Sequence, residues 1–243
     1  MRLIIAVTGA RVYALDSSVT LGPTHGIASS RMKQLSQLIR QANPGAKLVL
    51  FGHSLGSFIA QDYITRRPDL IDALILSGTA YRPPPPPQLI AALDVAARAA
   101  PLGPSEFWAN LFKDFNKPFS DQPGFDWLSR DAAEVQKYQR DPQAGFAFSN
   151  ELVRDILQGF TVLRDPAREA LIPKSLSVLV IQGSVDPVGE NLKGTQALLD
   201  RYQALGLTRV SHKFYDGARH EVLNETNRDE VTRDVLNWLK AVV

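Results

Sequence analysis

A serine flanked by glycines stands where a buried strand is expected to give way to a helix. Gly52-His53-Ser54-Leu55-Gly56 follows the apolar run 47–51 and precedes apolar residues at helical spacing. This is the G-x-S-x-G pattern in a strand–turn–helix context, in which a tight turn projects the serine hydroxyl above the sheet edge. The Leu55 backbone N–H and the helix N-terminus would then face an oxyanion developing on a bound carbonyl group. The pattern predicts that Ser54 is a nucleophile; the alternative is a glycine-rich turn with a serine helix cap.

A serine hydroxyl is a weak nucleophile unless a general base takes its proton, and the chain offers four histidines for that role. His220 follows the last expected strand and precedes the last expected helix, at the strand end where ligands and catalytic groups collect in open α/β sheets. We therefore predict that His220 is the base, the alternative being a structural loop histidine. His53 is fixed in the turn beside Ser54 and is expected to point elsewhere, His212 lies within an expected strand, and His25 lies in a Gly/Pro loop.

An acid that holds the tautomer of the base is expected in Gly183-Ser184-Val185-Asp186-Pro187-Val188, which directly follows the expected strand 177–181. Asp186 would face the same rim of the sheet and stabilise the imidazolium that forms during catalysis. The alternative is an ordinary Asp-Pro turn residue. Because the order Ser–Asp–His along the chain is that of the α/β hydrolases, the three residues together predict a catalytic triad.

These residues need a sheet to bring them together, and the chain has the pattern of one. Short, mostly apolar, runs alternate with helical patterns, as in a mostly parallel sheet covered by helices on both faces. The last helical pattern places Val231, Val235, Leu239 and Val242 on one face. We therefore expect an α/β-hydrolase fold, with strands at 11–15, 47–51, 73–76, 177–181 and 210–215.

The alternation stops between residues 82 and 172. The five prolines 83–87 predict a stiff extended connector. Helical patterns follow at 89–99, 106–115, 132–138 and 151–163, and eight of the eleven phenylalanines lie in this region, with Trp108 and Trp127. We interpret 82–172 as an inserted helical cap, or lid, on a core formed by 1–81 and 173–243. The rings form the core of the cap or line an apolar pocket, with Phe112, Phe115 and Trp127 as candidate substrate-binding residues.

The composition of the 243 residues excludes several other classes of protein. The absence of cysteine excludes disulfides and thiolate nucleophiles, and the scattered charge, +2 in total, speaks against a nucleic-acid partner. No run approaches the roughly 18 apolar residues of a membrane span. The short apolar start is not a signal peptide, so a cytoplasmic protein is expected. Neither a metal-binding spacing nor a nucleotide-binding glycine motif occurs, so we expect no metal and no cofactor.

Four stretches resemble the bacterial lysophospholipase and monoacylglycerol lipase-like α/β hydrolases, which are grouped with serine aminopeptidase-like hydrolases. They are 50–57 around Ser54, Asp126-Trp127-Leu128-Ser129-Arg130-Asp131, 183–189 around Asp186, and 217–226 around His220. The resemblance implies an ester hydrolase that acts on single-acyl lipids, monoacylglycerol or lysophospholipid, through Ser54, Asp186 and His220. It also implies a lid over the acyl pocket. Transient contact with a membrane surface is compatible with such a substrate.

The beginning of the chain departs from this family. Residues 9–16 resemble the family's fourth strand, but the three earlier strands and the His-Gly loop that donates the second oxyanion N–H have no counterpart. We expect an N-terminally truncated sheet and weak turnover, since losing one oxyanion donor costs about 3–4 kcal/mol. Thr24-His25-Gly26 is a candidate substitute donor.

The missing strand would leave backbone groups of 47–51 unpaired. The favoured solution is an inward shift of Arg11–Leu15 to pair with 47–51. Alternatively, residues 1–7 fill the space as a strand, or a second copy of the chain pairs with the edge as a homodimer. Two other functions stay open: a weak or inactive hydrolase-like binding protein, and a peptidase or acyltransferase on the same scaffold.

Overall fold

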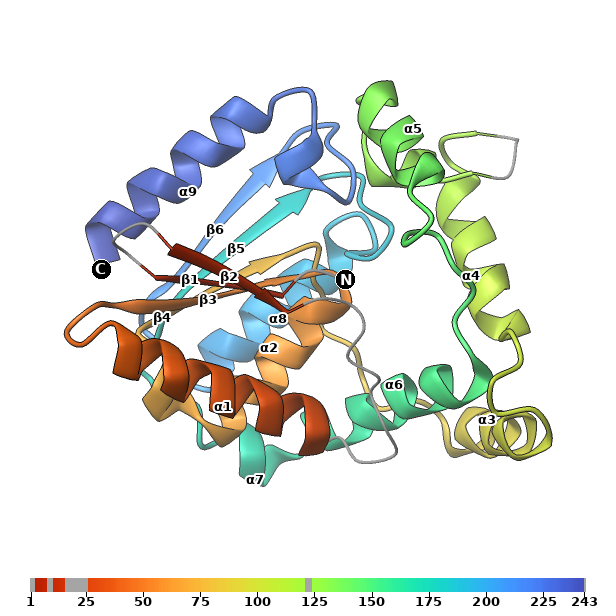
Figure 1. The fold of residues 1–243 in the computed structure, drawn as a ribbon, viewed down its shortest axis with the longest axis horizontal. Helices are drawn as coiled ribbons and strands as arrows, with labels where there is room; N and C mark the ends of the chain where they lie inside the picture. Colours follow the sequence, from red (N-terminus) through yellow and green to blue (C-terminus); the bar gives the residue numbers. More distant parts are fainter. Residues whose placement is uncertain (1–2, 8–10, 16–25, 121–123, 243) are drawn as a thin grey trace.

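The computed structural model describes residues 3–7, 11–15, 26–120 and 124–242, with side chains from Met32 onward. Within these ranges the core is one six-stranded sheet of order β2-β1-β3-β4-β5-β6 (Figure 1). Strands β3 to β6 run parallel to one another, which confirms the predicted α/β-hydrolase fold. The strands are β1 Leu3–Val7, β2 Arg11–Leu15, β3 Leu48–His53, β4 Ala73–Ser77, β5 Ser177–Gly183 and β6 Val210–Tyr215.

Helices cover both faces of this sheet because side chains alternate between its faces along each strand. Leu48 and Leu50 pack in a core with residues of α1 Gly26–Ala42, α2 Leu55–Arg66 and α8 Lys193–Ala204. Val49 and Phe51 pack on the opposite face beneath α9 Arg228–Val242. The predicted apolar face of α9 lies in that second core, and Figure 1 shows α9 on the side of the sheet opposite α1, α2 and α8.

The space next to β3 is filled differently from the favoured prediction. β1 pairs antiparallel with β3, with Leu3 opposite Gly52 and Val7 opposite Leu48, and β2 pairs only with β1. The inward shift of Arg11–Leu15 is therefore wrong, and residues 3–7 take that place. Antiparallel neighbours can be joined by a few residues, whereas a parallel crossover needs a dozen or more, so the three residues 8–10 suffice. Because β1 occupies this edge of β3, a second copy does not pair there; a homodimer through another edge of the sheet stays a prediction.

The segment between β4 and β5 is helical and lies beside the sheet rather than on it (Figure 1). Pro87 is the first residue of α3, a position that needs no N–H donor, so the proline connector ends one residue earlier than expected. Ser105 caps α4 and Ser149 caps α6, two helices that agree with the predicted patterns at 106–115 and 151–163. No helix in the described ranges has the length and apolar composition to cross a membrane. The helices are α3 Pro87–Ala99, α4 Glu106–Asn116, α5 Ala132–Arg140, α6 Asn150–Leu163 and α7 Pro166–Glu169, with short 3₁₀ turns η1 Pro68–Leu70, η2 Asp126–Leu128 and η3 Val222–Asn224.

Candidate active site

Ser54 occupies a strained turn between β3 and α2. Its φ of 54° and ψ of −127° lie where residues other than glycine rarely occur. The Ser54 N–H donates to Ser77 O at 2.9 Å, which ties the turn to the end of β4. At Gly52 a Cβ atom would lie 2.7 Å from Gly56 O and 2.8 Å from Ala60 Cβ, so only glycine fits there. Strain of this kind is found at functional sites, where the surrounding structure over-determines it.

Asp186 lies in the turn after β5, and its side chain is fully buried. One carboxylate oxygen, Oδ1, accepts from Val188 N at 2.8 Å, and the other, Oδ2, accepts from His220 Nδ1 at 2.9 Å. The amide of Gln182, itself fully buried, also donates to Oδ2. A buried carboxylate needs such donors because desolvation otherwise disfavours its charge. The hydrogen bond expected between Asp186 and His220 is thus present.

His220 follows β6 and is also buried, with 1% of its surface exposed. Its ring lies between the rings of His53 and Trp127, at centroid distances of 4.8 Å and 4.9 Å. His220 Nε2 has no hydrogen-bond partner within the described residues. The expected hydrogen bond to Ser54 is therefore not formed. Catalytic hydrogen bonds are often long before substrate binds. Since Nδ1 bonds Asp186, Nε2 is the nitrogen left for proton transfer.

The end of β4 supplies contacts that the sequence analysis missed. β4 lies between β3 and β5, so residues 77–79 reach both neighbouring turns. A Cβ atom on Gly78, whose φ is +58°, would lie 2.6 Å from His220 Cε1. The Thr79 N–H donates to Gln182 Oε1 at 2.9 Å, so Thr79 orients the amide that supports Asp186. The available signal was the position of Ser77-Gly78-Thr79 at the same carboxyl edge of the sheet as Ser54.

His53 lies closer to the site than expected, since its ring contacts that of His220. Its Nδ1 is 3.2 Å from Ser77 Oγ, and it does not replace His220 on Asp186. Burial, and then the neighbouring His220, hold the pKa of His53 well below its usual value. The ring next to His220 is therefore neutral near pH 7. His212, by contrast, is exposed on β6 and contacts Phe214.

The three aromatic residues predicted to bind substrate lie together beside His220. The Trp127 ring is 5.4 Å from that of Phe112 and 5.2 Å from that of Phe115, measured between centroids. Trp127 is buried in a cluster with Phe58 of α2 and residues of the segment between β4 and β5. An apolar surface therefore adjoins the histidine, as an acyl chain would require.

The remaining site predictions concern the oxyanion donors and bound metals. Leu55 is the first residue of α2, so its N–H lies at the helix N-terminus and is not used within the helix. Thr24 and His25 lie outside the described residues. In the described part of the chain no three histidine or carboxylate side chains are grouped to hold a metal ion.

Comparison with known proteins agrees with this architecture. The chain is 28% identical to a monoacylglycerol lipase of Mycolicibacterium smegmatis in an alignment that covers 95% of the chain and 78% of the relative. A carboxyl esterase from Bacillus coagulans superposes with a TM-score of 0.77 and 24% identity, covering 88% of this chain and 71% of that one. A structure described as a lipase in its open form superposes with a TM-score of 0.74 and is 25% identical. The match covers 90% of this chain and 73% of that one.

The sheet order, the covering helices and these similarities define the class of the protein as an α/β hydrolase of the serine hydrolase type. Within that class, the chain belongs to the Hydrolase_4 family, described as serine aminopeptidase, S33, whose family model matches residues 30–227. It resembles the monoacylglycerol lipases of that family, as the sequence motifs predicted.

Proposed function

We propose that the protein hydrolyses carboxylic esters of single-acyl lipids, monoacylglycerol or lysophospholipid, through an acyl-enzyme on Ser54. The observation that carries this proposal is the buried Asp186–His220 hydrogen bond of 2.9 Å at the same sheet edge as the strained Ser54 turn. That arrangement pairs an oriented base with a nucleophile on a turn built to expose it. The monoacylglycerol lipase among the relatives supports the substrate class.

In the proposed reaction Ser54 Oγ attacks the ester carbonyl carbon while His220 Nε2 takes the hydroxyl proton. The Leu55 N–H donates to the developing oxyanion from the N-terminus of α2. Collapse of the tetrahedral intermediate breaks the ester C–O bond, and His220 returns the proton to the leaving alcohol. Water, activated by the same imidazole, then hydrolyses the acyl-enzyme and releases the fatty acid. Asp186 stays ionised and stabilises the imidazolium in both halves of the reaction.

Phe112, Phe115 and Trp127 form the proposed wall for the acyl chain. Their rings are close together and Trp127 contacts His220, so an acyl group lying against them would have its carbonyl near the base. Apolar contact of this kind binds the chain without recognising its head group.

A substrate panel tests the proposed function. Purified protein is assayed on monoacylglycerol, lysophospholipid, p-nitrophenyl esters and aminoacyl amides, with S54A as the background control. We expect hydrolysis of the esters that S54A lacks, and faster turnover of single-acyl lipids than of amides. Aminopeptidase activity without esterase activity would contradict the proposal. A protein that turns over nothing and does not react with fluorophosphonate would instead be a hydrolase-like binding protein.

A further inference from the structure

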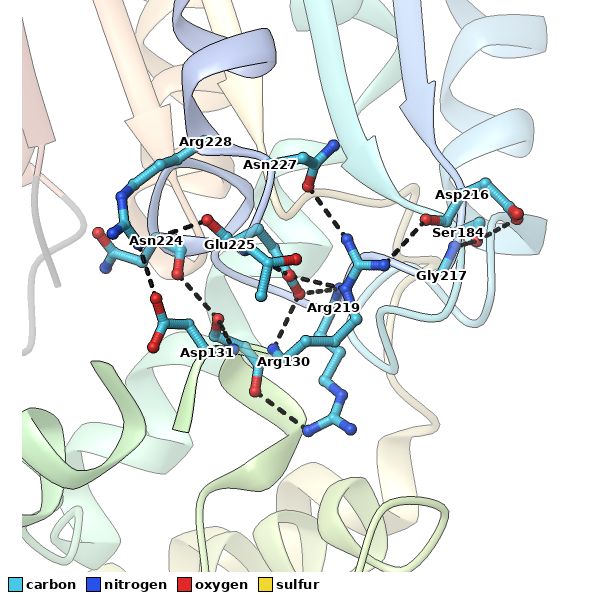
Figure 2. Close-up of polar contacts among 12 residues, drawn as sticks. Arg130, Asp131, Ser184, Asp216, Gly217, Arg219, Asn224, Glu225, Asn227 and Arg228 are labelled. Carbon is cyan, nitrogen blue, oxygen red and sulfur yellow. Dashed lines mark hydrogen bonds and ion pairs between the residues drawn. The ribbon is translucent and has the colours of Figure 1, made fainter. Parts of the chain in front are cut away.

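Glu225 is a fully buried carboxylate that the proposed reaction does not use. Its Oε1 accepts from two backbone N–H groups, those of Arg219 at 2.8 Å and of Arg130 at 3.1 Å. Its Oε2 accepts from Arg130 Nε at 2.8 Å and from Thr226 N at 3.1 Å. Figure 2 shows Glu225 between Arg130 and the Arg219 segment. Every one of these partners is a donor, so both oxygens are needed as acceptors.

Apart from Thr226 N, these donors come from the segment that carries His220 and from the segment that packs against its ring. Arg219 immediately precedes His220, and Arg130 follows Trp127, whose ring packs on His220, by three residues. The two segments also bond directly, since His220 N donates to Trp127 O at 3.3 Å and Glu221 N donates to Leu128 O at 2.8 Å. Glu225 therefore joins the loop that carries the histidine to the segment that carries the ring against it.

The Arg219 side chain strengthens the same junction from the other side. Its Nη1 donates to Asp126 O and to Ser129 O, and its guanidinium lies 4.5 Å from the centroid of the Phe119 ring. Ser129 Oγ in turn donates to Asn224 O at 2.8 Å. The backbone of 126–130 is thus bonded to 219–225 at several points, and the Glu225 carboxylate accepts from a backbone N–H of each segment.

We propose that Glu225, held by Arg130, is a positioning residue for His220. The carboxylate fixes the histidine loop against the Trp127 segment, so that the imidazole keeps its place between Asp186 and Trp127 while it takes and returns a proton. This inference rests on the proposed function only for its kinetic readout. Its structural content is that residues 126–131 are fixed to the loop that carries His220.

Glu225→Gln tests the proposal with almost no change in shape. The amide oxygen can still accept from two N–H groups, but the amide nitrogen would then face two donors and accept from neither. We expect kcat on p-nitrophenyl butyrate to fall about tenfold or more with KM within about twofold, since the base is displaced and the acyl surface is kept. We also expect the downfield proton NMR signal of His220 Nδ1–H, bonded to Asp186, to broaden or disappear.

Asp72→Asn is the matched control. Asp72 also accepts from a backbone N–H, that of Leu48 at 2.7 Å, and from a guanidinium, that of Arg40 at 2.9 Å, but at the opposite ends of β3 and β4. D72N should lower the melting temperature while kcat and the His220 signal stay unchanged. If E225Q lowers only the melting temperature, as D72N does, the proposal is overturned and Glu225 is purely structural.

Arg130→Gln decides the question if E225Q does not fold. This variant removes the guanidinium and keeps the three backbone donors to Glu225, so we expect a several-fold fall in kcat and a broadened His220 signal. A folded R130Q with both unchanged would overturn the proposal. The NMR signal needs no turnover, so a wild-type protein without esterase activity would contradict the proposed function and leave this inference open to its own test.

Discussion

At the level of single residues, the position of His220 depends on the room that Gly78 leaves for its ring as well as on hydrogen bonds. Gly78 sits with a positive φ directly under the imidazole, where a Cβ atom would lie 2.6 Å from His220 Cε1 and 2.8 Å from Nδ1. The ring has little room to move elsewhere because His53 and Trp127 flank it. Gly78 therefore leaves the space that the His220 imidazole occupies, although it carries no reactive group.

Gly78→Ala should lower kcat by about 10- to 100-fold, because a displaced base loses much of its contribution to proton transfer. Gly45→Ala is the control, since Gly45 also has a positive φ, +81°, but has no atom within 4 Å of the added Cβ. Both variants should lose about 1–2 kcal/mol of stability from the left-handed backbone. Equal kcat in the two variants, measured well below their melting temperatures, would show that Gly78 does not constrain His220.

His53 gives the protein a pH-dependent stability. Burial and His220 hold its folded pKa well below 6.5, so the unfolded chain binds a proton first as the pH falls. Above the pKa that His53 has in the unfolded chain, the residue is neutral in both states and its contribution to stability is fully present. Between that pKa and the lower pKa of the folded protein, only the unfolded chain binds the proton, so this contribution is lost as the pH falls. The free energy of unfolding should decrease there by up to about 1.4 kcal/mol per pH unit.

Urea unfolding at about pH 7 and about pH 5.5 measures this effect in the wild-type protein and in His53→Gln. The difference in unfolding free energy between the two pH values should be smaller in H53Q, because the variant has no proton to gain at this position. An identical pH dependence in the two proteins would contradict the assignment of the shift to His53.

At the level of elements, the loop that carries His220 and the helical segment between β4 and β5 meet through aromatic rings. Phe112 lies on α4 and contacts Trp127 of η2, which packs on His220. If this surface holds the acyl chain, its removal should matter in proportion to chain length. Each buried methylene group contributes about 0.8 kcal/mol, so short esters should lose little.

Phe112→Ala should therefore lower kcat/KM about tenfold for p-nitrophenyl octanoate and less than twofold for p-nitrophenyl acetate. Phe146→Ala is the control, because Phe146 is a half-exposed ring of the same cap that stacks on Phe148 instead. An equal loss on both esters, or an equal loss in F146A, would rule out Phe112 as part of the acyl-binding surface.

Some of the strands and site positions could be predicted from the sequence, and others could not. Strands β3 to β5 were predictable because apolar runs bounded by turn residues specify buried parallel strands locally. That Ser54, Asp186 and His220 lie in the turns after β3, β5 and β6 was predictable from the same alternation of strands and helices. Gly78 and Glu225 were not, since each acts on a partner that only the folded chain brings near; Glu225 and Arg130 are 95 residues apart. The pairing of β1 with β3 was an alternative and not the favoured prediction, because a strand carries no sequence mark of its partner.

At the scale of the whole molecule, four parallel strands bring three turns to one edge of the sheet. Ser54 follows β3, Asp186 follows β5 and His220 follows β6, while β4 between them supplies Gly78 and Thr79. The residues span 54 to 220 in sequence, so the site forms only when the sheet is complete. We expect this assembly to activate Ser54 through His220 and Asp186.

Fluorophosphonate labelling followed by peptide mass spectrometry measures whether Ser54 is activated. We predict one label per chain, located on Ser54, no labelling of S54A, and labelling of H220A slowed by about 10²- to 10⁴-fold because the base is lost. Labelling of another residue, or a rate in H220A equal to that of the wild-type protein, would contradict the account.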